Sequence, residues 1–140
     1  VAEHDGYARM VDPVVHRREV TFGRSTGLLS VTDHFYGPPN QSGTHDLMWA
    51  FPFAPHCDIT CVASGWIIRT PRQELLLVAP TCFPEGKPLS VSAKIEDGWV
   101  APKYGIRQRS QYLRWLWTGQ TPISVHFTIC RTEGIGGSVD

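Results

Sequence analysis

The chain has 140 residues, and its 13 basic and 13 acidic residues leave no net charge. This balance argues against a general nucleic-acid binder, which would show a basic excess or stripe, and no apolar run is long enough to span a membrane. An acidic ligand would therefore have to be held by a local cluster of arginines and not by the field of the whole molecule.

Short strands separated by turns account for most of the chain. Eleven prolines and thirteen glycines are typical of frequent turns, and no segment shows a sustained helical period. In chain order, strands are expected at residues 16–22, 28–36, 45–53, 58–62, 66–69, 74–79, 89–95, 111–117 and 123–130. Turns are expected at residues 37–40, 71–72 and 84–86.

The fold class follows from this pattern of elements. Many short strands at regular spacing predict an all-β fold, an antiparallel β-sandwich of about nine or ten strands with no substantial helix. Residues 1–132 are expected to form the sandwich domain, and the glycine-rich residues 133–140 a flexible tail.

Alternation of apolar and polar residues indicates the core. Residues 123–130 give the clearest case, with apolar side chains at every second position. We expect Trp49, Phe51, Val125 and Phe127 to face one core between two sheets. Two further tryptophans, Trp115 and Trp117, are also expected to be buried.

The four cysteines do not have the spacing of metal ligands. Cys57 and Cys61 lie four residues apart in an expected strand, which separates their Cα atoms by about 13 Å, whereas a disulfide needs less than about 7 Å. The sequence has no C-x-x-C pair and its histidines are scattered, so zinc is not expected. Buried free thiols are the favoured state, and a bridge between strands distant in sequence stays open.

His4 and Tyr7 near the start of the chain are candidate ligand-binding residues. They could contact sugar hydroxyls or a carboxylate, or they could pin the loop before the first long strand. A turn at Asp12 and Pro13 should bring the strand that begins at His16 back beside the His4 loop.

Arg17 and Arg18 are the candidate anion-binding residues. They alternate faces of their strand, so only one of them can point at a given ligand. A guanidinium suits a carboxylate or a sulfate. The alternative is a salt bridge to Glu19 or to a carboxylate on a neighbouring strand.

Trp99 and Tyr104 flank Pro102 in an expected loop, where they could stack on sugar rings or anchor the loop by burial. Nucleophilic or dyad catalysis is not expected. The pairs His45–Asp46 and Asp33–His34 are adjacent in strands and therefore point to opposite faces.

Four ordered segments carry a resemblance to a known family. They are His4 to Arg9, Leu29 to Asp33, Gly43 to Phe51 and Gly98 to Gly105. In this order and spacing they resemble the C-terminal β-sandwich of the heparinase II/III-like polysaccharide lyases. The resemblance implies a larger parent protein that cleaves acidic, uronate-containing polysaccharide by β-elimination, with a helical catalytic domain and a sandwich that lines the cleft.

The resemblance also implies what this chain would lack. The helical toroid and the histidine-rich metal segment of the family should lie upstream of Val1, so we expect no catalytic residue, cofactor or metal within this chain. The expected partners are the acidic polysaccharide and the helical catalytic domain, with no nucleic acid or membrane. A periplasmic or secreted location is implied, with a cytoplasmic one left open. The alternatives are a free-standing carbohydrate-binding or structural module, and a domain that mainly makes protein contacts.

Overall fold

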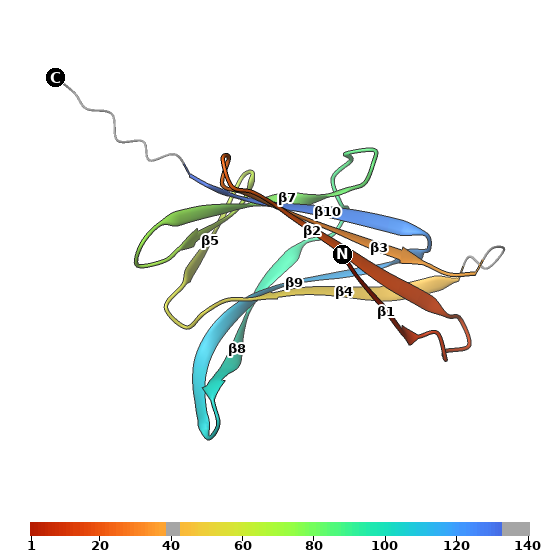
Figure 1. Cartoon of the computed structure of the whole chain (residues 1–140), viewed down its shortest axis with the longest axis horizontal. Helices are drawn as coiled ribbons and strands as arrows, with labels where there is room; N and C mark the ends of the chain where they lie inside the picture. The colour runs from red at the N-terminus through yellow and green to blue at the C-terminus, as the bar shows by residue number, and fades with distance from the viewer. Residues whose placement is uncertain (39–42, 133–140) are drawn as a thin grey trace.

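The computed structural model describes residues 1–38 and 43–132, and these residues form ten strands and no helix. The strands are β1 (Ala2–Tyr7), β2 (Val14–Gly23), β3 (Leu28–Tyr36), β4 (Thr44–Pro52), β5 (Asp58–Val62), β6 (Gly65–Arg69), β7 (Glu74–Cys82), β8 (Ala93–Lys103), β9 (Ile106–Gln120) and β10 (Ile123–Arg131) (Figure 1). The expected tail at residues 133–140 and part of the expected turn at 37–40 lie outside the described residues.

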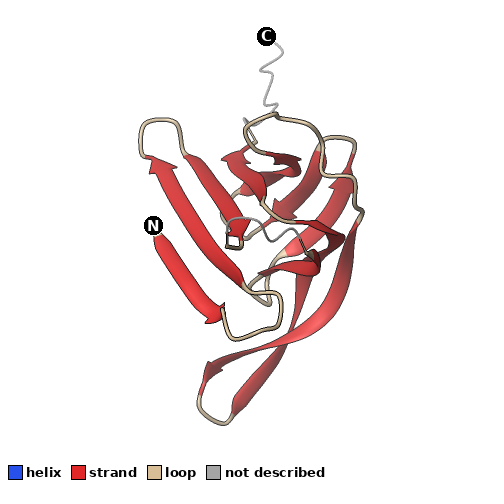
Figure 2. Ribbon diagram, turned by 90° about the vertical axis from the view of Figure 1, so that its right-hand side faces the viewer, coloured by secondary structure: helices blue, strands red, loops and turns tan. Residues whose placement is uncertain are grey.

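Two antiparallel sheets make the two layers of the fold. The larger has seven strands in the order β1-β2-β3-β10-β7-β6-β5, and the smaller has three in the order β4-β9-β8. Figure 1 shows the two sheets one above the other, and Figure 2 shows β1 at the edge of the larger sheet. The predicted all-β sandwich is confirmed. No described helix could cross a membrane.

Aromatic side chains fill the space between the sheets. Trp49, Trp115, Val125 and Phe127 are buried, and the half-buried Phe51 packs against them. The ring centroids of Phe51 and Phe127 lie 4.9 Å apart. The common core expected from the alternation is therefore confirmed, although Trp117 is only half-buried and packs at the periphery of the core.

Residues 89–92 and 2–7 are among the segments that differ from the expected elements. Residues 89–92 are not a strand, and β8 begins only at Ala93. Leu89 is buried and its backbone N–H donates to the carbonyl of Pro80 at 3.0 Å, so the alternation there reflects packing of a loop onto the core. Residues 2–7 form β1 instead of a loop. All six are exposed, so this strand needs no apolar residue at alternate positions and lacks the pattern that would predict it.

The four cysteines are free thiols. Cys61 is exposed, while Cys57, Cys82 and Cys130 are half-buried. The thiols are free as expected, but none is fully buried, and Cys61 is exposed because β5 is an edge strand of the larger sheet.

One carboxylate lies inside the sandwich. Asp33 in β3 has no exposed side-chain surface, and Arg18 in β2 donates to both of its oxygens at 2.7 Å from Nε and Nη2. His16 Nε2 lies 2.7 Å from the same carboxylate, and its ring stacks on Phe35 with 4.4 Å between centroids. The hydrogen bond to Asp33 raises the pKa of Arg18, against the opposing effect of burial. Arg18 thus neutralises a buried carboxylate.

Candidate functional site on the outer face

The face of the larger sheet that points away from the core carries rows of polar side chains. One row crosses four strands, because Glu3 pairs with Arg17, Arg17 with His34, and His34 with Ser124. Neighbouring strands lie about 4.8 Å apart, so the row extends over about 14 Å. Such a length suits an extended ligand more than a single ion.

His34 lies within this row, between Arg17 and Ser124. Its Nδ1 lies 2.8 Å from the hydroxyl of Ser124, and its Nε2 lies 3.9 Å from Glu19. Glu19 in turn pairs with Arg17 at 2.8 Å. These contacts hold the imidazole in place while its side chain remains 24% exposed, so it can still reach a ligand.

A second row lies beside the first on the same face. Thr32 pairs with His126 across β3 and β10, and its hydroxyl lies 2.9 Å from His126 Nδ1. The Nε2 of His126 lies 3.2 Å from the hydroxyl of Thr128. Both ring nitrogens of His126 are thus occupied, which indicates a supporting position for this residue and not a ligand contact.

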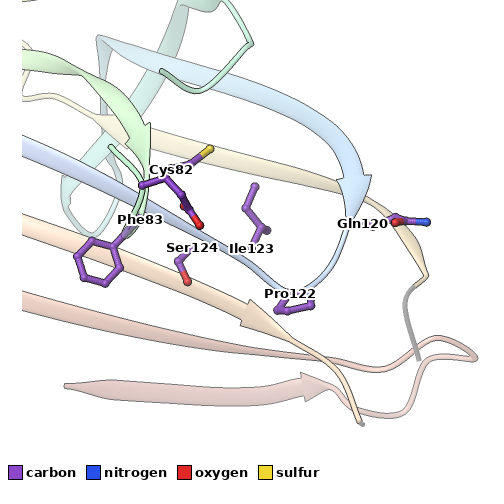
Figure 3. Close-up of a pocket in the computed structure, with 7 residues that line it drawn as sticks. Cys82, Phe83, Gln120, Pro122, Ile123 and Ser124 are labelled. Atoms are coloured by element: carbon purple, nitrogen blue, oxygen red, sulfur yellow. The ribbon is translucent and has the colours of Figure 1, made fainter. Parts of the chain in front are cut away.

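Two adjoining depressions open on this face. The first, which we call the outer-face hollow, is lined by Arg17, Glu19, His34, Phe35, Tyr36, Pro122 and Ser124. The second is lined by Cys82, Phe83, Glu85, Gln120, Pro122, Ile123 and Ser124. Pro122 and Ser124 line both, so the two lie next to each other. In Figure 3, Ser124 and Ile123 leave β10 on opposite sides, with Ser124 on the side of Phe83.

Aromatic groups border the polar side chains. The Phe83 ring lies 6.2 Å from His34, edge to face, and at the same distance from His126. Phe83 is 49% exposed. An exposed aromatic ring next to hydroxyl, imidazole and guanidinium groups offers a sugar both a flat apolar contact and hydrogen bonds.

Arg17 and Glu19 are the charged side chains that line the hollow, and Tyr36 adds a phenol. Tyr36 donates to Glu3 at 2.6 Å, and this hydrogen bond raises the pKa of the Tyr36 phenol, so the group stays neutral at ordinary pH. Among the residues that the structure describes, Arg17 has one carboxylate partner, Glu19. Because a guanidinium carries five N–H donors, Arg17 retains donors for a second anion.

The arrangement favours binding over catalysis. Ser124 and His34 could be viewed as a nucleophile and its base, but the acid Glu19 is 3.9 Å from the imidazole, too far for a hydrogen bond. Within residues 1–38 and 43–132, no group of three His, Cys, Asp or Glu residues could hold a metal ion. Hydroxyl, imidazole and guanidinium groups on an open face suit recognition of a polar, acidic ligand.

The candidate residues near the start of the chain lie on both faces of the larger sheet. The expected return after Asp12 and Pro13 is present, since β1 and β2 form a hairpin with His4 opposite His16. The rings of His4 and Tyr7 lie 5.6 Å apart. The two arginines point in opposite directions, as expected. Arg17 lines the outer-face hollow, whereas Arg18 is bound to Asp33.

Trp99 and Tyr104 lie elsewhere, on the smaller sheet. Trp99 is in β8 and not in a loop, because β8 and β9 form a long hairpin that turns at Tyr104 and Gly105. Gly105 has a φ of +75°, which favours glycine in so tight a turn. Both aromatic side chains are exposed, so the hairpin is not anchored by their burial. Figures 1 and 2 show this hairpin extending beyond the rest of the domain.

The two adjacent pairs considered as dyads do not interact with each other. Asp33 is buried beside Arg18, while His34 lies on the outer face with Ser124. His45 lies 3.4 Å from Asp12, and Asp46 accepts a hydrogen bond from Thr118. The expectation from strand geometry is confirmed for both pairs.

Sequence reasoning missed most of the outer-face hollow. His34 was considered only as half of a catalytic dyad, and Tyr36 and Ser124 were not singled out, because the hollow joins strands that are far apart in the chain. A signal existed in the polar half of each alternation, at every second residue of β3 and β10. That signal is weak, because polar residues at alternate positions are also what a solvated sheet face requires.

Comparison with known proteins identifies the family of the chain and supports its fold. A family model described as Heparinase II/III-like, C-terminal, matches residues 1–127. A solved structure described as heparinase III is similar with a TM-score of 0.62 and 18% identity, over 94% of this chain and 19% of that chain. The chain thus spans 19% of the length of that protein, and at this identity the likeness shows the fold alone. Comparison with curated proteins finds no match.

Proposed function

The chain belongs to the heparinase II/III-like C-terminal family, and from this premise we propose that it is an accessory β-sandwich domain of a polysaccharide lyase. In this role it packs against a helical catalytic domain and lines one wall of the cleft that holds an acidic, uronate-containing polysaccharide. The parent acts by β-elimination, outside the cytoplasm. The observation that carries the proposal is the family match over residues 1–127.

The outer-face hollow is the proposed contact with the polysaccharide. Arg17 provides the charge for a carboxylate or sulfate, and it is held in place by Glu19 at 2.8 Å. His34, Tyr36 and Ser124 provide groups that hydrogen-bond to sugar hydroxyls. The fixed positions of His34 and Ser124, 2.8 Å apart, lower the entropy that a ligand must remove on binding.

The 140-residue chain by itself is expected to show no lyase activity. β-Elimination needs a base for the C5 proton, an acid for the leaving oxygen and neutralisation of the uronate carboxylate, and in the proposed role the helical catalytic domain of the parent supplies these groups. The measurement is ultraviolet absorbance of the unsaturated product with heparin, heparan sulfate, alginate or chondroitin at high protein concentration. Product formed by a repurified sample would contradict the proposal, since a complete active site would then lie in this chain.

Binding through the outer-face hollow is tested with Arg17→Gln. We expect the variant to bind a heparan sulfate oligosaccharide about tenfold more weakly, the loss of one charge-assisted contact. The measurement is an NMR titration that follows the backbone amides of His34 and Ser124. Arg72→Gln is the matched control, because Arg72 is exposed in the turn between β6 and β7 and loses the same charge. Equal binding by Arg17→Gln and the unaltered chain would place the sugar elsewhere.

A further inference from the structure

The β8–β9 hairpin carries a stack of aromatic and cationic side chains. Trp99 in β8 pairs with Arg109 in β9. The guanidinium of Arg107 lies over the Trp99 ring at 4.1 Å from its centroid, and that of Arg109 lies at 5.8 Å. Arg107 and Arg109 are two residues apart in one strand, so they point to the same face about 7 Å from each other.

This face continues the core-facing side of the smaller sheet. Nearer the sandwich, the same sides of β8 and β9 carry Ala93 and the buried Leu113 and Trp115, which pack in the core. Where the hairpin extends beyond the larger sheet (Figure 1), the inward-facing position is occupied by Trp99, which is 53% exposed. This side of the smaller sheet is thus apolar where the larger sheet covers it, and it carries cationic and aromatic side chains where the hairpin extends past the larger sheet.

The cations of the hairpin are not neutralised by the described parts of the chain. Neither Arg107 nor Arg109 has a carboxylate within 4.0 Å among those residues, and the same holds for Lys103. Of the nearby acids, Glu96 is bound by Arg114 and by Tyr112. Asp97 lies on the same face as Trp99 and makes no ion pair with a residue in 1–38 or 43–132. Positive charge is therefore concentrated here on a chain that has no net charge.

Stacking prepares these guanidiniums for an anion. A ring under the flat side of Arg107 restricts its rotamers and leaves the N–H groups at its edge free. Such an edge can bind a carboxylate or a sulfate with two parallel hydrogen bonds. With Arg107 over the Trp99 ring, the site presents guanidinium edges where a protein partner would need an apolar centre.

We propose that the Trp99–Arg107–Arg109 face of the β8–β9 hairpin is a second binding site, specific for carboxylate or sulfate groups on an acidic oligosaccharide. The proposal rests on the proposed function, and it adds a contact on the smaller sheet to the outer-face hollow on the larger. Two sites on one domain increase the effective concentration of a long polyanion at each of them. Tyr104, exposed at the tip of the same hairpin, extends the site with a second aromatic ring.

The test uses the indole N–H of Trp99, because the other tryptophans, Trp49, Trp66, Trp115 and Trp117, are buried or half-buried. We expect a sulfated heparin oligosaccharide to shift the NMR signal of this indole group. An unsulfated uronate oligosaccharide in a parallel titration tells whether carboxylates suffice, and either result fits the site. Affinity should decrease as salt is raised, because the contact is ionic and exposed.

The double variant Arg107→Gln/Arg109→Gln is expected to weaken the binding seen at Trp99 by about tenfold or more. Arg24→Gln/Arg72→Gln, which removes two exposed turn arginines, is the control for net charge and should leave this binding unchanged. Equal weakening by both double variants would overturn the proposal, since any loss of charge would then suffice. An acidic peptide that shifts the Trp99 signal at lower concentration than the sugars would also overturn it, in favour of a protein partner.

The failure of this site and the failure of the proposed function can be told apart. If the sugars shift His34 and Ser124 but not Trp99, the hairpin proposal is wrong and the outer-face hollow stands. If Trp99 responds and the outer face does not, the hollow is wrong and the hairpin stands. If neither responds, both are wrong.

Discussion

Arg18→Met is expected to destabilise the domain more than Asp33→Asn, although both break the same ion pair. The side chain of Asp33 has no exposed surface, whereas that of Arg18 is 41% exposed. Removal of Arg18 leaves a carboxylate in the interior that keeps His16 as its one side-chain partner among the described residues, and such an uncompensated buried charge costs about 3–5 kcal/mol. Removal of the carboxylate leaves a guanidinium that can turn to water, at a cost of about 1–3 kcal/mol.

Urea denaturation of both variants measures this difference in the free energy of unfolding. The double variant Arg18→Met/Asp33→Leu is the control, because it removes both charges and should recover most of the stability lost in Arg18→Met. A larger loss in Asp33→Asn than in Arg18→Met would mean that the carboxylate supports the fold mainly through His16, which lies 2.7 Å from it.

Strand positions could be predicted from the sequence wherever one side of a strand is buried. The strand expected at residues 28–36 coincides with β3, and that at 123–130 matches β10 except for its last residue. The alternation of Val125 and Phe127 with Ser124 and His126 assigned each side chain to the correct face, because a period of two allows only two assignments.

Strand pairing could not be predicted in the same way, and the candidate site depends on it. His34 and Ser124 are 90 residues apart in the chain and meet only because β10 pairs with β3. Alternation tells which side chains face outward but not which strands are neighbours. The partner of Arg18 could not be predicted for a related reason. Asp33 lies on the next strand, inside an otherwise apolar face.

Trp49→Ala is expected to cost about 3–5 kcal/mol, a large share of the about 5–15 kcal/mol that stabilises a typical domain. Trp49 is 2% exposed and extends from β4 in the smaller sheet toward the larger sheet. Its ring centroid lies 5.5 Å from that of Phe35 in β3 and 6.4 Å from that of Phe127 in β10. Truncation to alanine therefore opens a cavity between the two layers, which the paired backbones around it cannot close.

Chemical denaturation of Trp49→Ala beside Met48→Ala measures the effect of position within one strand. Met48 is 58% exposed, so its truncation should change the free energy of unfolding by no more than about 0.5 kcal/mol. The indole N–H of Trp49 has no hydrogen-bond partner among the described residues, so the loss in Trp49→Ala reflects packing alone and Trp49→Phe should restore part of it. An equal effect of the two alanine substitutions would mean that β4 is paired one residue out of register with β9, because such a slip exchanges the faces of Met48 and Trp49.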